Sequence, residues 1–137
     1  MGNRLYKIDK LAHCVQIVFK SGVVVGPDDI LAAIEHENEL YSIKDRLSLW
    51  DFRGCQATPD FGFNAMNRVV DRIRRKYGHA TPTNRTALVV EGSTEYGLSR
   101  MFQMLMDGFP TQIGVFLDET AARDWIGRQG RSEEKSP

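Results

Sequence analysis

The chain has 137 residues, 42% hydrophobic and 26% charged, which is typical of one soluble globular domain with a single core. Its 18 basic and 18 acidic side chains cancel, which argues against a nucleic-acid or anionic-membrane surface. No apolar run approaches the roughly 18 residues of a membrane span. The two cysteines, Cys14 and Cys55, are far apart in sequence. They predict reduced, partly buried thiols in a cytoplasmic protein, with a disulfide or a redox role as the alternative.

The first fifty residues predict a β-hairpin followed by a helix. Residues 5–8 form a short strand, and residues 14–19, rich in β-branched and aromatic side chains, form the return strand. Pro27 suits the first position of a helix that follows. Helical spacing predicts that its apolar side chains face the sheet: Ile30, Leu31, Ala33, Ile34 and Tyr41. Its acidic side chains are expected to point outward: Glu35, Glu37 and Glu39.

From residue 47 to residue 127 the chain repeats a unit of apolar strand, loop and amphipathic helix. The units pair strand 47–52 with a helix at about 59–77, strand 85–90 with one at about 94–107, and strand 112–117 with one at about 120–127. Strands that alternate with helices predict a parallel sheet, because parallel neighbours need a crossover connection. The predicted fold class is α/β, a single domain with a mixed, mostly parallel sheet of about five strands flanked by about four helices. The domain covers residues 1–128, and residues 129–137 form a polar tail that is expected to be disordered.

The third predicted helix has an unusual distribution of side chains. A polar row recurs every four residues: Glu95, Ser99, Gln103 and Asp107. The apolar side chains fill about half the circumference or more, wider than the about 100° stripe that one sheet contact needs. Met104 and Met106 flank this arc on opposite sides. The arc predicts deep burial, the wall of an apolar pocket, or a subunit contact through Met104 and Met106, most simply in a homodimer.

Three segments resemble a known superfamily: residues 49–54 (LWDFRG), residues 95–101 (EYGLSRM) and residues 115–126 (VFLDETAARDWI). With the order of elements, they resemble a branch of small uncharacterised bacterial proteins related to the anti-sigma-factor antagonists of the STAS superfamily, which are SpoIIAA-like. The resemblance covers roughly residues 5–128. It implies a mixed sheet with flanking helices and a role in protein or small-ligand binding rather than catalysis.

The chain departs from the phosphorylation motif of these antagonists, Asp-Ser-Ser-Gly or a close variant at the start of the helix after the central strand. Alignment through Asp51 and Gly54 puts that motif on residues 59–62, which read Pro-Asp-Phe-Gly. The glycine is kept and the hydroxyls are absent, so we expect no phosphorylation there. Thr58 is the nearest hydroxyl, and the pattern favours it as the N-cap of the second helix.

No catalytic signature stands in the chain. It lacks a GxSxG elbow, a phosphate-binding GxxxxGK[ST] loop and a GxGxxG loop after a strand. Its three histidines fall in different predicted elements, and none forms an HExxH pair. The sequence therefore predicts a protein that is not an enzyme and that holds neither a metal nor a cofactor.

Two loops are candidates for ligand or partner binding because each follows a parallel strand and precedes a helix. The first contains Arg53, Gly54 and Thr58, and the second contains Gly92, Ser93 and Thr94. Free backbone N–H groups at such points favour an anion, and open sheets bind ligands along this edge. The alternative is that the hydroxyls cap helices and the glycines turn the chain.

These observations leave two classes of function. The first is a non-catalytic STAS-like module that regulates through contact with a protein partner and forms a homodimer. The second is a carrier or sensor of a small apolar or acidic ligand, lipid-like in character, held by the strand carboxyl-end loops. Neither class needs a nucleic acid or a membrane span.

Overall fold

A five-stranded sheet forms the centre of the computed structural model, which describes residues 4–78, 84–109 and 111–135, with side chains up to residue 127. Its strands stand in the order β1 (Tyr6–Lys10), β2 (Val15–Phe19), β4 (Leu47–Asp51), β6 (Arg85–Val89) and β7 (Gln112–Phe116). β1 is antiparallel to β2, and all other neighbours are parallel. The predicted α/β fold class is confirmed, and the four parallel strands begin and end within one residue of the predicted positions.

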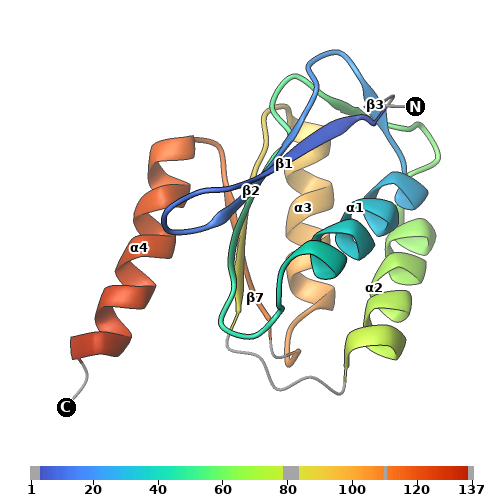
Figure 1. Ribbon diagram of the computed structural model, residues 1–137. Coiled ribbons are helices and arrows are strands. Elements are labelled where there is room, and N and C mark those ends of the chain that lie inside the picture. Colours follow the sequence, from blue (N-terminus) through green and yellow to red (C-terminus); the bar gives the residue numbers. More distant parts are fainter. Residues whose placement is uncertain (1–3, 79–83, 110, 136–137) are drawn as a thin grey trace.

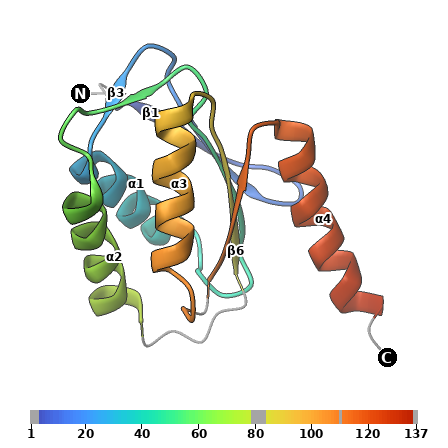
Figure 2. The ribbon, with the colours of Figure 1, turned by 180° about the vertical axis from the view of Figure 1, so that it is seen from behind.

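Helices cover both faces of this sheet (Figures 1 and 2). One face carries α1 (Pro27–Leu40), α2 (Phe63–Tyr77) and α3 (Ser93–Leu105), and the other carries α4 (Glu119–Lys135). Alternate residues of one strand therefore enter two different cores. On β4, Leu49 packs in the cluster that contains Ala122 and Ile126 of α4, whereas Trp50 packs in the cluster on the opposite face. Because both faces are covered, the central strands β4 and β6 are largely buried on both sides.

Two short strands, β3 (Val24–Val25) and β5 (Gln56–Ala57), pair in parallel as a separate two-stranded sheet. They correct the predicted start of the second helix. The backbone N–H of Thr58, just after β5, donates to the Val25 carbonyl at 3.0 Å, so Thr58 continues the pairing with β3 rather than capping a helix. α2 begins only at Phe63, with Gly62 as its N-cap.

The structure also corrects the outward orientation expected for Glu37. This side chain is buried, at 2% exposure, and lies on the face of α1 that points toward the sheet. α4 continues to Lys135, through most of the segment that the sequence assigns to a polar tail, so the domain boundary at residue 128 stays a prediction. Cys14 and Cys55 are both free and buried. None of the helices in the described part of the chain has the length and apolarity of a membrane span.

Candidate functional site

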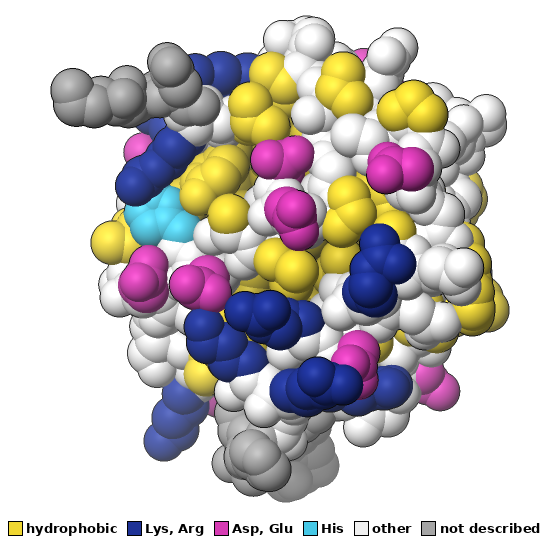
Figure 3. Space-filling view, turned by 90° about the vertical axis from the view of Figure 1, so that its right-hand side faces the viewer, with side chains coloured by type: hydrophobic (Ala, Val, Ile, Leu, Met, Phe, Trp, Pro, Cys, Tyr) yellow, Lys and Arg dark blue, Asp and Glu magenta, His cyan; other side chains and the backbone are white. Residues whose placement is uncertain are grey.

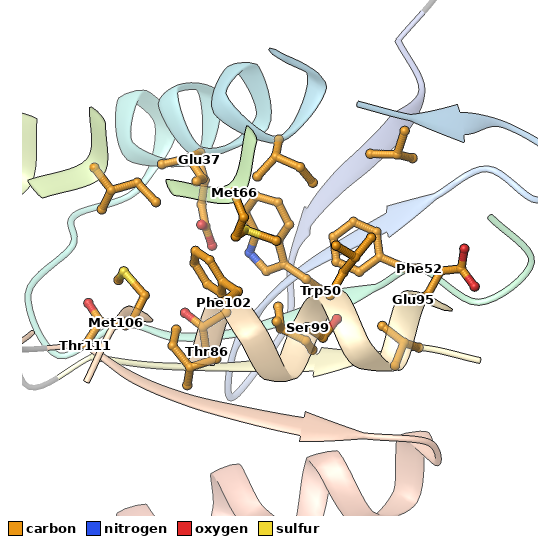
Figure 4. A pocket seen from close by; sticks show the side chains of 18 of the residues that line it. Glu37, Trp50, Phe52, Met66, Thr86, Glu95, Ser99, Phe102, Met106 and Thr111 are labelled. Carbon is orange, nitrogen blue, oxygen red and sulfur yellow. The ribbon is translucent and has the colours of Figure 1, made fainter. Parts of the chain in front are cut away.

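A cavity of about 140 Å³ lies between the sheet and helices α1, α2 and α3 (Figure 4). The sheet contributes the rings of Trp50 and Phe52, and the helices contribute apolar side chains that include Met66, Phe102 and Met106. Almost the whole lining is apolar. For comparison, an engineered apolar cavity of about 150 Å³ in another protein binds benzene. The space is therefore large enough for a small apolar molecule.

Short polar side chains on facing elements help to leave this space unfilled. Ser99 of α3 is buried at 9% exposure and lines the cavity, as does Thr86 on β6. Ser99 belongs to the polar row predicted on α3, and Glu95 of the same row also lines the cavity. Two members of the polar row, Glu95 and Ser99, thus face the cavity, although a position beside Phe102 would ordinarily hold a larger apolar side chain. A serine there packs less volume than a leucine would, and the difference remains as empty space.

One part of the cavity wall is a buried ion pair. Glu37 of α1 and Arg46, which precedes β4, approach within 3.3 Å (Oε1 to Nη2), and their side chains are only 3% and 8% exposed. The Ser48 hydroxyl donates to Glu37 Oε2 at 2.6 Å. Arg46 donates through Nη1 to the Tyr41 carbonyl at 3.0 Å and through Nε to Ser48 Oγ at 3.2 Å. Both carboxylate oxygens of Glu37 are therefore occupied.

Burial raises the pKa of Glu37, and the charge of Arg46 and the hydrogen bonds from Ser48 and Trp50 offset only part of that rise. The desolvation of a carboxylate disfavours its charged form, and a nearby cation favours it. Among the groups that favour the charged form of Glu37, Arg46 contributes most.

Two polar atoms beside this ion pair have no hydrogen-bond partner among the described residues. They are Trp50 Nε1 and Asn38 Oδ1, and both residues line the cavity. The Trp50 N–H nevertheless faces the Glu37 carboxylate and acts to lower its pKa. Trp50 is 4% exposed, and its indole nitrogen lies on the side of the ring nearest Glu37 (Figure 4). A buried donor or acceptor that lacks a partner costs about 1–3 kcal/mol. Asn38 Oδ1 is therefore the wall atom at which a hydrogen-bond donor would be stabilised.

Glu95 lies toward the other end of the cavity. Its side chain occupies the helix N-terminus at which the sequence predicts a bound anion. Its Oε2 accepts the backbone N–H of Ala57 at 3.2 Å. Its Oε1 lies so close to Gly92 that a Cβ there would come within 2.5 Å. The carboxylate of Glu95 thus occupies the positive end of α3, where an exogenous anion would otherwise be favoured.

The six predicted loop residues do not line the cavity: Arg53, Gly54, Thr58, Gly92, Ser93 and Thr94. Arg53 donates from Nη2 to Asp51 Oδ2 at 2.7 Å and to Glu119 Oε1 at 2.6 Å, so two carboxylates compensate its charge. Burial acts to raise the pKa of Asp51, but the hydrogen bonds and charge of Arg53 outweigh it and lower that pKa. Gly54 turns the chain beside Ser21 with a φ of 83°. Ser93 and Thr94 lie exposed at the start of α3.

The two methionines proposed for self-association are separated by the fold. Met104 is 71% exposed, whereas Met106 is 4% exposed and packs against Val69, Val70 and Ile73 of α2. The apolar arc of α3 therefore lines the cavity through Leu98, Phe102 and Met106 and reaches the surface at Met104. A subunit contact on this helix stays a prediction for Met104.

Sequence reasoning missed Glu37, Arg46 and Trp50 as site residues. A signal existed for Glu37, because it follows Ala33 by four residues and Ile34 by three, which places all three on one helix face. No local pattern identified Arg46, whose partner is nine positions earlier in the chain.

Comparison with solved structures shows which fold this is. The chain superposes with a TM-score of 0.52 on the crystal structure of an uncharacterised DUF3478-family protein from Shewanella loihica PV-4. The alignment covers 88% of this chain and 91% of the other, with 17% sequence identity. That protein is described as having a SpoIIAA-like fold. The present chain has the same fold. The SpoIIAA-like architecture that the sequence predicts is therefore confirmed, and the likeness at this identity concerns the fold alone.

Comparison with family models and with curated proteins gives no match for the chain. In the described residues, no group of three or more His, Cys, Asp or Glu side chains is arranged to hold a metal ion. Because a shared fold does not fix a function, the site must be interpreted from its own geometry.

Proposed function

We propose that this protein is a non-catalytic binding module that holds a small, mainly apolar ligand between its sheet and helices α1, α2 and α3. The observation that carries the proposal is the apolar cavity with polar groups in its wall, the usual composition of a small-molecule site. The sequence places such a ligand at the strand carboxyl-end loops. The geometry favours the helix-covered face of the sheet, because the loop residues make their contacts elsewhere.

Surface hollows that adjoin the cavity support access for such a ligand. A groove of about 280 Å³ between α1 and α2 shares Ile34, Ile73 and Tyr77 with the cavity lining. A hollow of about 640 Å³ at the C-terminal end of α3 shares Met106 and Phe109, among others. Figure 3 faces the α1–α2 side, where hydrophobic side chains reach the surface between acidic and basic ones. Small movements of side chains in these shared walls would open a path inward.

The test is native mass spectrometry of protein purified from its own host, compared with two variants of α3. Ser99→Leu places a larger side chain in the cavity, and Arg100→Leu makes a similar change at an exposed neighbouring position. We expect a co-purifying small molecule with the wild type and with Arg100→Leu, and less of it with Ser99→Leu. If the wild type carries no small molecule and also fails to bind benzene or toluene in solution, the proposal is wrong.

A second candidate function is regulation through contact with a protein, either a partner or a second copy of the chain. It is favoured by the exposure of two large apolar side chains, Met104 at 71% and Phe63 at 55%. Native mass spectrometry separates the candidates, because a clean dimer or a bound protein without a small molecule would favour protein contact.

A further inference from the structure

The two strands at the ends of the five-stranded sheet differ in how their outer edges are protected. β1 carries exposed, charged side chains at Lys7, Asp9 and Lys10. Charged side chains on an edge strand, lysine above all, hinder its pairing with another chain. β7, at the opposite end, reads Gln-Ile-Gly-Val-Phe and contains neither a charge nor a proline. Side chains therefore protect one end of the sheet and leave the other end open to pairing.

The register of β7 shows which of its backbone groups are used within the chain. The Gln112 N–H donates to the Asn84 carbonyl at 3.1 Å, and the Phe116 carbonyl accepts the Val90 N–H at 2.9 Å. Alternate residues of a parallel strand direct both backbone groups to the same neighbour. The residues of β7 that face β6 are therefore Gln112, Gly114 and Phe116.

The other two residues of β7, Ile113 and Val115, direct their backbone groups to the outer edge. The Ile113 carbonyl accepts Gln103 Nε2 of α3 at 2.8 Å. The N–H of Ile113 and both backbone groups of Val115 have no hydrogen-bond partner within the described part of the chain. Figure 2 shows β7 running between α3 and α4. A row of unpaired backbone groups of this kind is a template for another strand.

Exposed apolar side chains flank this edge. Met104 of α3 is 71% exposed, and Leu117, directly after β7, is 62% exposed. Met104 lines the same hollow as Gln112 and Ile113, so it lies beside the strand. We use the term β7 edge for the outward backbone groups of Ile113 and Val115 together with Met104 and Leu117. Its backbone groups and its apolar side chains both lack a partner.

We propose that the β7 edge binds the β7 edge of a second copy of the chain, antiparallel about a twofold axis, so that the two sheets become one. A second copy is the fitting partner because a twofold contact is self-complementary: the outward N–H and carbonyl groups of one strand meet those of the other, and apolar side chains meet apolar ones. This step rests on the second candidate function, contact with a protein, and does not depend on a ligand in the cavity.

Amide hydrogen exchange, followed by NMR, tests the interface at two protein concentrations that sedimentation shows to hold monomer and dimer. We expect the Ile113 and Val115 amides to exchange at least about tenfold more slowly in the dimer. Gln112, Gly114 and Phe116 are controls in the same strand, because β6 protects their amides in both states. The proposal is overturned if the wild type stays monomeric, or if the Ile113 and Val115 amides exchange equally fast in both states.

Variants at Val115 test the backbone donor separately from the side chain. Val115→Pro removes the outward N–H and no hydrogen bond to β6, a position at which an edge strand tolerates proline. Val115→Ala also loses side-chain volume but keeps the donor, and is the matched control. We expect Val115→Pro to weaken dimerisation at least about tenfold and Val115→Ala to change it less than about threefold. If Val115→Pro does not fold, Leu117→Lys replaces it, with Leu117→Met as its control.

The outcomes distinguish this interface from the second candidate function. If the chain forms a dimer that neither Val115→Pro nor Leu117→Lys weakens, contact with a second copy stands and the assigned edge is wrong. If a different protein protects the edge amides and a high concentration of the chain alone does not, the second copy is the wrong partner.

Discussion

Removal of Arg46 should destabilise the protein far more than removal of a surface arginine, because it leaves a carboxylate buried without a partner. Arg46→Met deletes the 3.3 Å ion pair with Glu37 and the hydrogen bonds to Tyr41 and Ser48. Both side chains of the pair are less than one-tenth exposed, so solvent offers little compensation. Breaking a buried pair on one side typically costs about 3–5 kcal/mol. We expect a loss of that size in the free energy of unfolding at pH 7.

The pH dependence of this loss gives a second check. Burial already raises the pKa of Glu37 above its ordinary 4.5, and without Arg46 that pKa should rise further. A carboxyl whose pKa is higher in the folded state binds more protons when folded. Its destabilising effect is therefore full above the folded-state pKa and shrinks as the pH falls toward 4.5. The deficit of Arg46→Met relative to wild type should accordingly diminish at acidic pH.

Urea denaturation at several pH values measures both effects. The matched control is Arg75→Met, which breaks an exposed pair of 2.8 Å with Asp71 and should cost less than about 1 kcal/mol. The double variant Glu37→Gln with Arg46→Met removes the orphaned charge and should recover much of the loss. The reasoning is refuted if Arg46→Met costs no more than the control, or if the double variant is as unstable as Arg46→Met alone.

Three further predictions follow from burial and backbone geometry. By urea denaturation, Trp50→Ala should cost about 3–5 kcal/mol, and Trp125→Ala, at a partly exposed site, should cost less; equal losses would contradict the assigned burial. In sedimentation at micromolar concentration, Met104→Glu should shift a wild-type dimer toward monomer without unfolding, whereas Met106→Glu should unfold the chain; a monomeric wild type would exclude the contact. Gly54→Ala, with φ at 83° and Ser21 Oγ 2.6 Å from the new Cβ, should lower the melting temperature through a loss of about 1–3 kcal/mol, without changing toluene binding.

The sequence predicted the sheet because each parallel strand is a short apolar run before an amphipathic helix. That pattern depends on burial from both sides, which the central strands β4 and β6 show most fully. The pattern did not predict the shortest strands. β5 has two residues, too few to show alternation, so its pairing with β3 was not predicted and Thr58 was assigned to a helix cap instead.

The candidate site was less predictable for a different reason. A cavity is what remains after distant elements pack, and no single segment encodes it. The two candidate loops were predicted because helix N-termini attract anions. Glu95, however, places a carboxylate of the protein itself at the N-terminus of α3. The charge of Glu37 predicts an outward side chain, whereas its spacing places it on the apolar face of α1. The charge and the periodicity of Glu37 thus predict opposite orientations, and the periodicity is correct. Arg46, the buried partner of Glu37, could be identified only from the fold.

Two costly features coincide in this domain, and their coincidence is the strongest physical argument for a binding site. A cavity of about 140 Å³ leaves the apolar side chains that line it without packing partners on one side. The Glu37–Arg46 pair beside it adds the desolvation of two charges, which a pair of apolar side chains would avoid. Single domains are typically stable by only about 5–15 kcal/mol, so features of this kind matter. A ligand at a hundred times its dissociation constant would add about 2.7 kcal/mol to the stability of the folded state. Larger apolar side chains at Ser99 and Glu37 would fill part of the cavity and avoid a buried charge, and a ligand bound there, as proposed, would make the missing packing contacts instead.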